Sequence, residues 1–219
     1  MTEATCIDRR RVLRAGAWSA PVISIAAAAP TLAASSTTRN VTGTLTWGVK
    51  ASFRRYITSP MAKGEVTMSD GVTQPGGTGP FVWPGGEGTV DEDGTVFVQY
   101  GGTVNFNGHD GALDVTVSNP RIMLNPGGTG TLSVTYTSTD GETSTLVLAD
   151  LTGGNVVDSD TTIVVDNGAV DPDADSTNTA LAESGVVVFS GSMTPGGPIM
   201  EFYAAGDQMN SFETTLTVS

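Results

Sequence analysis

The stretch that decides the fold is Val96-Phe97-Val98-Gln99-Tyr100-Gly101-Gly102-Thr103-Val104-Asn105-Phe106. Its two halves, 96–100 and 103–106, are rich in β-branched and aromatic residues, a composition typical of half-buried β-strands. The two glycines between them are a turn signal. The stretch is therefore interpreted as a hairpin of two antiparallel strands.

The same pattern continues on both sides of this stretch. Turn signals rich in Gly, Pro, Asn and Asp, such as Asn107-Gly108 and Asp140-Gly141, separate short apolar runs. Many short strands with such punctuation predict an all-β fold, an antiparallel β-sandwich or barrel-like domain. The further predicted strands are 41–49, 113–117, 131–136, 144–148, 186–189 and 213–218.

One segment, near residues 50–58, departs from the β pattern, because it contains no Gly or Pro and its apolar residues recur at helical spacing. Phe53 and Ile57 are four residues apart and would share the inward face of a short helix. Ser52 and Tyr56 have the same spacing and would lie together at the edge of that face. The sequence therefore predicts one short helix in a β-rich domain.

The charge composition argues against two classes of partner. The chain has 219 residues, with 10 Lys and Arg against 23 Asp and Glu, for a formal net charge of -13. Such an acidic chain would be repelled by a nucleic-acid backbone or an anionic membrane surface. No long linker divides residues 36–219, so one domain is expected there.

The first 35 residues resemble an export signal. Arg9-Arg10-Arg11 and Arg14 form a basic region, residues 15–29 are weakly apolar, and Leu32-Ala33-Ala34-Ser35 offers a cleavage site. The order of the basic residues resembles a twin-arginine (Tat) signal of actinobacterial kind. The alternative is a short N-terminal helix of a cytoplasmic protein. We therefore expect a secreted or cell-envelope-associated domain with no membrane anchor in the mature chain.

Export would also remove the single cysteine, Cys6. The mature domain would then have no disulfide, no thiolate nucleophile and no Cys-ligated metal. Four of the basic residues that remain lie between positions 50 and 63, in and beside the predicted helix. These four are Lys50, Arg54, Arg55 and Lys63.

Catalytic motifs are weak in this chain. The single histidine, His109, lies in a glycine-flanked turn, where a solvated residue is the common interpretation. A serine hydrolase would need it as its base, yet no Gly-x-Ser-x-Gly motif is present. No spacing singles out a glycosidase carboxylate pair. Asp171-Pro172-Asp173-Ala174-Asp175 lacks the Gly and Glu of a calcium loop and is interpreted as a solvated acidic loop.

Four segments, taken in order, resemble the motifs of one known family of domains. The segment at 45–57, LTWGVKASFRRYI, is similar to the opening motif of that family. The segment at 104–115, VNFNGHDGALDV, resembles its central Gly-His-x-Gly-x-Leu motif. Residues 118–122, SNPRI, and 202–206, FYAAG, are similar to the two motifs that follow. Together these segments resemble the HtaA haem-binding domain family of actinobacteria. The resemblance spans about residues 40–210 and implies a protein that binds haem.

The resemblance also implies roles for single residues. Tyr56 matches the tyrosine that ligates ferric haem iron, and His109 matches the histidine that hydrogen-bonds the phenolate of that tyrosine. Ser52 matches a serine near a haem propionate, and Tyr203 matches a tyrosine that lines the pocket. The sequence departs from the family at 207–211, DQMNS, where a different closing loop is usual.

Chemical reasoning extends this assignment to neighbouring residues. Haem b carries anionic propionates, and the cations near Tyr56, Arg55 among them, would offset the acidity of the chain. Phe53, Ile57 and Met61 are candidates, with Tyr203, for an apolar slot that holds the macrocycle. For Met61 a core position that fills a gap is the alternative. Trp47 and Trp83 are predicted core residues.

The leading hypothesis is a secreted carrier, not an enzyme, that captures ferric haem through a tyrosinate ligand and passes it on for haem and iron uptake. Its partners would be haem and a surface haem receptor or haem-donor protein. An exported β-sandwich adhesion or interaction module that binds a protein or glycan without haem is the alternative. A secreted hydrolase is the third possibility.

Overall fold

Side chains that alternate between core and solvent organise residues 38–167 and 171–219, the part of the chain that the computed structural model describes, into antiparallel strands. Strand β7 (Gly130–Thr137) shows the pattern clearly, with Leu132, Val134 and Tyr136 buried between half-buried neighbours. The prediction of an all-β, antiparallel fold with one short α-helix near 50–58 is confirmed. The predicted export signal at 1–35 lies outside the described residues.

Strands make up most of the described residues. The strands are β1 (Arg39–Trp47), β2 (Glu65–Ser69), β3 (Phe81–Val90), β4 (Val96–Gln99), β5 (Thr103–Gly108), β6 (Leu113–Leu124), β7, β8 (Thr143–Leu151), β9 (Asn155–Asp158), β10 (Thr162–Asp166), β11 (Asp175–Leu181), β12 (Ser190–Gly191), β13 (Met200–Glu201), β14 (Gln208–Asn210) and β15 (Phe212–Val218). The helices are α1 (Ala51–Ile57) and the 3-10 helices η1 (Pro75–Gly77), η2 (His109–Gly111) and η3 (Glu183–Phe189).

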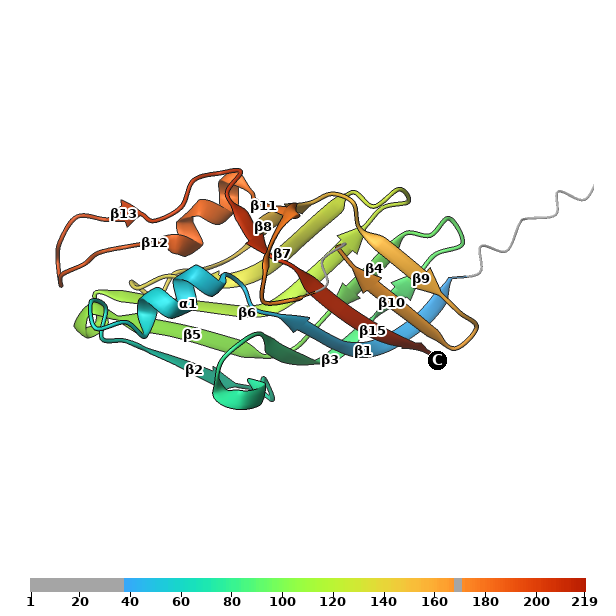
Figure 1. Ribbon diagram of the computed structural model, residues 1–219, viewed down its shortest axis with the longest axis horizontal. Helices are drawn as coiled ribbons and strands as arrows, with labels where there is room; N and C mark the ends of the chain where they lie inside the picture. Colours follow the sequence, from blue (N-terminus) through green and yellow to red (C-terminus); the bar gives the residue numbers. More distant parts are fainter. Residues whose placement is uncertain (1–37, 168–170) are drawn as a thin grey trace, which may run out of the picture. The chain divides into compact units, whose positions relative to one another are not determined.

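Thirteen of the described strands form one curled sheet, a half-barrel (Figure 1). Its main path runs β14-β11-β8-β7-β6-β4-β3-β1-β15-β10-β9, and β5 pairs with β6 and carries β2 at its other edge. Strand β15 lies between β1 and β10, so the last strand of the chain is interior to the sheet. Its register with β1 runs from Val41 opposite Val218 to Trp47 opposite Phe212.

The predicted hairpin at 96–106 is wrong. Strands β4 and β5 do not pair with each other; both pair with β6, end to end along its length. Gln99 lies opposite Arg121 and Thr103 opposite Ser118, so the register is nearly continuous across the two glycines. Gly102 has a φ of 107° and breaks one long strand into two instead of reversing it.

The predicted strand at 186–189 is also wrong, because these residues belong to the 3-10 helix η3. A continuous apolar run has no strict alternation and does not by itself distinguish a strand from a buried helical turn. The helix packs on β8, where the amide of Ala182 donates to the carbonyl of Leu148. A Cβ at Gly185 would lie 2.3 Å from that same carbonyl oxygen, so glycine permits the close approach.

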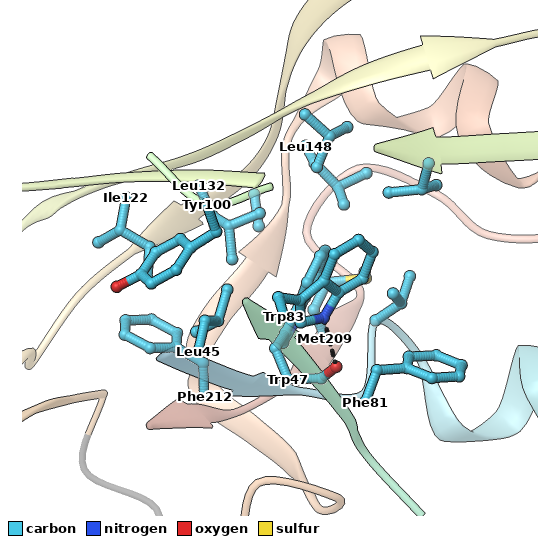
Figure 2. Packing of buried hydrophobic residues seen from close by; sticks show 14 of the residues in the cluster. Leu45, Trp47, Phe81, Trp83, Tyr100, Ile122, Leu132, Leu148, Met209 and Phe212 are labelled. Atoms are coloured by element: carbon cyan, nitrogen blue, oxygen red, sulfur yellow. Dashed lines mark hydrogen bonds between the residues drawn. The ribbon is translucent and has the colours of Figure 1, made fainter. Parts of the chain in front are cut away.

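Aromatic and aliphatic side chains together form the buried core of the sheet (Figure 2). Trp47 and Trp83 are fully buried with ring centroids 5.9 Å apart, and the indole N–H of Trp83 donates to the carbonyl of Trp47 at 3.1 Å. The prediction that both are core residues is confirmed. Phe81 packs edge-on against Trp83 and continues this core toward α1 (Figure 2).

Within the described residues, no helix has both the length and the apolar character needed to cross a membrane.

Candidate functional site

Helix α1 leaves β1 through a sharp turn that the sequence pattern does not reveal. Val49 has a φ of 63°, a left-handed conformation rare for a β-branched residue, and it redirects the chain toward the core. The backbone amide of Ala51, at the start of the helix, has no partner within the helix. It donates to the side-chain oxygen of Asn210, at the end of β14. Phe53 and Ile57 are buried, as the spacing predicts. The sheet therefore determines how the helix is oriented.

The other predicted pair on α1 lies at the edge of the core. Ser52 and Tyr56 are both partly buried, so each keeps part of its side chain accessible. The ring of Tyr56 lies 5.5 Å from that of Phe202, measured between centroids. The tyrosine thus has an aromatic neighbour from the segment after β13, far away in sequence.

Tyr56 and His109 meet across the site. The phenolic oxygen of Tyr56 lies 2.6 Å from Nε2 of His109, although the residues are 53 positions apart. His109 opens η2, and its backbone amide donates to the carbonyl of Ala62 at 2.8 Å. His109 is therefore not simply a solvated turn residue, because its ring is hydrogen-bonded to the side chain of Tyr56 on α1.

Burial raises the pKa of Tyr56 above its ordinary value of 10.0. Without a ligand, the phenol is therefore protonated at neutral pH. When Nε2 of His109 carries no proton, the hydroxyl of Tyr56 donates to it. The same pair works in reverse once the phenol has lost its proton, because a protonated Nε2 donates to a phenolate oxygen.

A second tyrosine, Tyr203, contacts the same helix at Ser52. The hydroxyl groups of Tyr203 and Ser52 are 2.8 Å apart, so the two residues share a hydrogen bond. Burial raises the pKa of Tyr203, and the hydrogen bond from Ser52 opposes this effect. The ammonium of Lys50 lies 5.4 Å from the centroid of the Tyr203 ring, within range of a cation–π contact.

Two residues predicted to line the apolar slot, Phe53 and Met61, differ in how far they are buried. Phe53 is buried, and its ring packs against those of Phe106, Phe189 and Tyr203, so it supports Tyr203 from the core. Met61 is 69% exposed, and the alternative of a core position is therefore wrong.

The four cations around the helix divide into two pairs. Lys50 is ion-paired with Asp175 at 2.7 Å, and Arg54 is buried and ion-paired with Asp173. Two carboxylates of the segment interpreted as a solvated acidic loop are therefore ion-paired, and their side chains stay 39% and 32% exposed. Arg55 is exposed and has no carboxylate partner within the described residues.

The fourth cation, Lys63, is likewise exposed and unpaired among the residues that the structure describes. Arg55 is close enough to Tyr203 to oppose the rise in its pKa, and it also lines a cleft of about 430 Å³ with Thr58 and Gln74. Arg55 and Lys63 thus offer positive charge that no described acidic residue neutralises.

Sequence reasoning missed two residues of this site. Phe202 lies in the segment that resembles the fourth family motif, but no role was inferred for it. Asn210 caps α1 from the segment 207–211, where the sequence departs from the family. No signal in the sequence pointed to Asn210, because its contact with Ala51 spans 159 positions.

The fold and the site together define a class: a half-barrel of antiparallel strands in which a short helix presents a tyrosine to a histidine from a strand-to-strand turn. Comparison with known families agrees with this class. The chain matches the family model described as Htaa over residues 42–215, and it therefore belongs to the HtaA family.

Solved structures show the same relationship. The chain is 26% identical to the C-terminal domain of HtaA from Corynebacterium glutamicum, with a TM-score of 0.65, over 84% of this chain and 100% of that one. It is 27% identical to the N-terminal domain, with a TM-score of 0.59, over 81% of this chain and 97% of that one.

A third similar structure is a domain-swapped dimer of a histidine-to-alanine variant of the same C-terminal domain, 27% identical with a TM-score of 0.54. It covers 79% of this chain and 94% of that one. No curated protein matches the chain.

Proposed function

We propose that this chain binds ferric haem b at the edge of α1, with the phenolate of Tyr56 as the axial ligand of the iron. The observation that carries the proposal is the 2.6 Å contact between the Tyr56 oxygen and Nε2 of His109. Membership in the HtaA family, which implies a role in haem uptake, supports the same assignment.

The residues present fit such a ligand. Ferric haem supplies a hard Lewis acid that favours an anionic oxygen donor, and tyrosine is an established axial ligand in haem proteins. Tyr56 must give up a proton whose loss burial opposes, and His109 is placed to accept it at Nε2. The imidazole then donates to the phenolate oxygen, which stabilises the negative charge and holds the ring of Tyr56 in place.

Neighbouring side chains would contribute the rest of the site. Phe202 and Tyr203 offer aromatic walls beside Tyr56, and Phe53 holds Tyr203 from the core. Arg55 and Lys63 would attract the propionates, because no described carboxylate neutralises either one. Ser52 would offer a further hydroxyl, in exchange for its present bond to Tyr203.

We propose further that the protein is a carrier, not an enzyme. It would be exported through a twin-arginine signal, act outside the cell or at its envelope, and pass haem to a surface receptor or accept it from a donor protein. The support for export is the sequence of residues 9–35, which lie outside the described part of the chain.

A titration of ferric haem into the full chain, followed by visible absorbance, tests the ligand assignment. The wild-type chain should saturate at one haem per chain, with a Soret band and phenolate charge-transfer features. Tyr56→Phe should lose these features. Tyr136→Phe is the matched control, because Tyr136 does not belong to the site and its variant should titrate like the wild type.

Two results would contradict the proposal. An unchanged spectrum and affinity in Tyr56→Phe would show that another group ligates the iron. A flat titration of the wild-type chain would remove haem binding altogether. The remaining candidate would then be an interaction module for a protein or glycan.

A further inference from the structure

A second concave site lies near the first but is lined by different residues. A cleft of about 530 Å³ opens between η2, the β7–β8 turn at 138–142 and the segment from η3 through β12 to β13. Tyr56 and His109 do not line it. Its lining includes Asp110, Tyr136, Asp140, Val187, Ser192 and Ile199.

Tyr136 has an unused hydrogen-bonding group in this cleft. The residue is only 6% exposed, and its hydroxyl has no hydrogen-bond partner among the described residues. Burial raises the pKa of Tyr136, and the nearby charge of Asp140 raises it further, so the hydroxyl keeps its proton at neutral pH. The hydroxyl oxygen is not among the fully buried polar atoms that lack a partner, so it is accessible from the cleft, where a ligand can form a hydrogen bond with it.

The polar groups of the cleft mostly accept hydrogen bonds. Asp110 and Asp140 contribute carboxylates, and neither is ion-paired within the part of the chain that the structure describes. The hydroxyls of Ser190 and Ser192 donate to the carbonyls of Val186 and Thr194, so neither is available as a donor, and the Ser192 oxygen already accepts from the amide of Thr194. No Lys or Arg lines the cleft. The missing component is therefore a cationic donor.

The cleft also has an aliphatic wall. Val187 is 45% exposed and Ile199 is 70% exposed, so both present apolar surface to solvent. An aliphatic chain that ends in a cation matches this combination, because its stem can cover apolar surface while its head pairs with carboxylates. Lysine and arginine side chains have this form.

We propose that this cleft docks a short basic segment of a partner protein and takes up a lysine or arginine side chain between Asp110 and Asp140. The phenol of Tyr136 can accept from the cation or donate to a carbonyl of the segment. A peptide segment fits better than a free amine, because it would also cover Val187 and Ile199.

The cleft is connected through its wall to the proposed haem site, and the role inferred from this connection rests on the proposed haem function. The segment that forms its wall, 190–199, leads through β13 into Phe202 and Tyr203 at the Tyr56 site. A partner docked here would therefore lie next to the haem site, as exchange of haem between proteins requires.

The test titrates capped tripeptides into the full chain without haem and follows backbone amide NMR signals. The probe is acetyl-Gly-Lys-Val-amide, and its matched control carries norleucine, which keeps the stem and removes the charge. Saturable shifts at Gly111, Ala112 and Gly191 are expected with the lysine peptide. The norleucine peptide should bind at least about tenfold more weakly, as loss of a charge-assisted pair predicts.

Variants locate the contact. The double variant Asp110→Asn with Asp140→Asn should weaken lysine-peptide binding by about tenfold or more. Glu142→Gln is the control, because Glu142 lies on the same β7–β8 turn but does not line the cleft. Its binding should be unchanged. The amide spectrum of each variant shows directly whether the fold is retained.

Three results would overturn the proposal: no saturable shift with the lysine peptide, equal binding of the norleucine peptide, or equal binding of free spermidine. The last would assign the cleft to small polyamines. Because these titrations contain no haem, failure of the haem proposal leaves their outcome unaffected.

Discussion

At the scale of single residues, the backbone at His109 explains why its ring reaches Tyr56. His109 and Asp110 both have a left-handed φ, 55° and 54°, and Gly111 follows at 86°. Such conformations cost energy in non-glycine residues and persist where surrounding contacts hold them. Here the bond from the His109 amide to Ala62 holds the turn against the segment after α1.

The proton on Tyr56 gives a prediction at this scale. Because burial raises the Tyr56 pKa, protons compete with iron for the phenolate, and haem affinity should fall as the pH is lowered. In His109→Ala no imidazole accepts that proton. The affinity of this variant should be about 10–100-fold lower, and it should fall by about tenfold per unit between about pH 8 and about pH 6.

Ferric haem titrations at several pH values measure this slope. His109→Gln is the matched control, because its amide keeps a polar partner for the phenol without offering a basic nitrogen. It should recover part of the affinity but not the shallower pH dependence of the wild type. A slope in His109→Ala equal to that of the wild type would contradict the proton-acceptor role.

At the scale of elements, the orientation of α1 depends on a segment more than a hundred residues later. Arg54 donates to Asp173 and to the carbonyl of Gly48, and its guanidinium lies 5.5 Å from the centroid of Phe81. Gly48 permits this approach, because a Cβ there would lie 2.1 Å from the guanidinium. The acidic segment thus holds the helix that carries Tyr56.

This arrangement predicts that Arg54→Gln lowers the free energy of unfolding by about 2 kcal/mol, because a partly buried ion pair loses one partner and Asp173 keeps its charge. Haem affinity should fall with it, since α1 loses an anchor. Urea unfolding followed by tryptophan fluorescence measures the first effect.

Arg39→Gln is the control for this prediction. Arg39 and Asp158 form an ion pair exposed to solvent, and such pairs contribute little to stability. The substitution should therefore change the unfolding midpoint far less than Arg54→Gln. Equal effects of the two substitutions would show that the Arg54 pair does not anchor the helix.

At the scale of the whole molecule, strands from the two ends of the described chain, β1 and β15, pair with each other in the interior of the sheet. Strand β15 pairs with β1 and with β10. The buried hydroxyl of Tyr100, the residue that follows β4, donates to the hydroxyl of Thr214 on β15 at 2.7 Å. Burial raises the pKa of Tyr100 strongly, so this hydroxyl remains a donor. Strand β15 therefore contributes both backbone pairing and a buried hydrogen bond to the half-barrel.

A chain that ends at Asn210 should lose cooperative unfolding and the near-ultraviolet circular dichroism of its buried tryptophans. The reason is that removal of β15 leaves β1 and β10 without their shared partner and takes the buried side chains of Phe212 and Leu216 out of the core. Thermal unfolding followed by circular dichroism measures the effect.

Removal of Ser219 alone is the control. It deletes only the bonds to the carbonyl of Asn40 at the edge of the pairing. That variant should unfold like the full chain. A cooperative transition that persists in the chain ending at Asn210 would contradict the prediction.

The sequence by itself determined the class of fold and the family, and it singled out Tyr56 and His109, which the structure brings into contact. Strand composition indicated the antiparallel β-rich domain, helical spacing indicated α1, and the motifs containing Tyr56 and His109 indicated the family. These signals are local, because the side-chain period of a strand or helix is visible within a few residues.

Only the tertiary structure decided how these parts meet. It showed Gly101-Gly102 as a break in one strand, and it paired Lys50 and Arg54 with Asp175 and Asp173. It also brought together Asp110, Tyr136 and Asp140 around a second cleft. Each of these arrangements depends on which distant segments share a sheet or a core, and local periodicity carries no information about that choice.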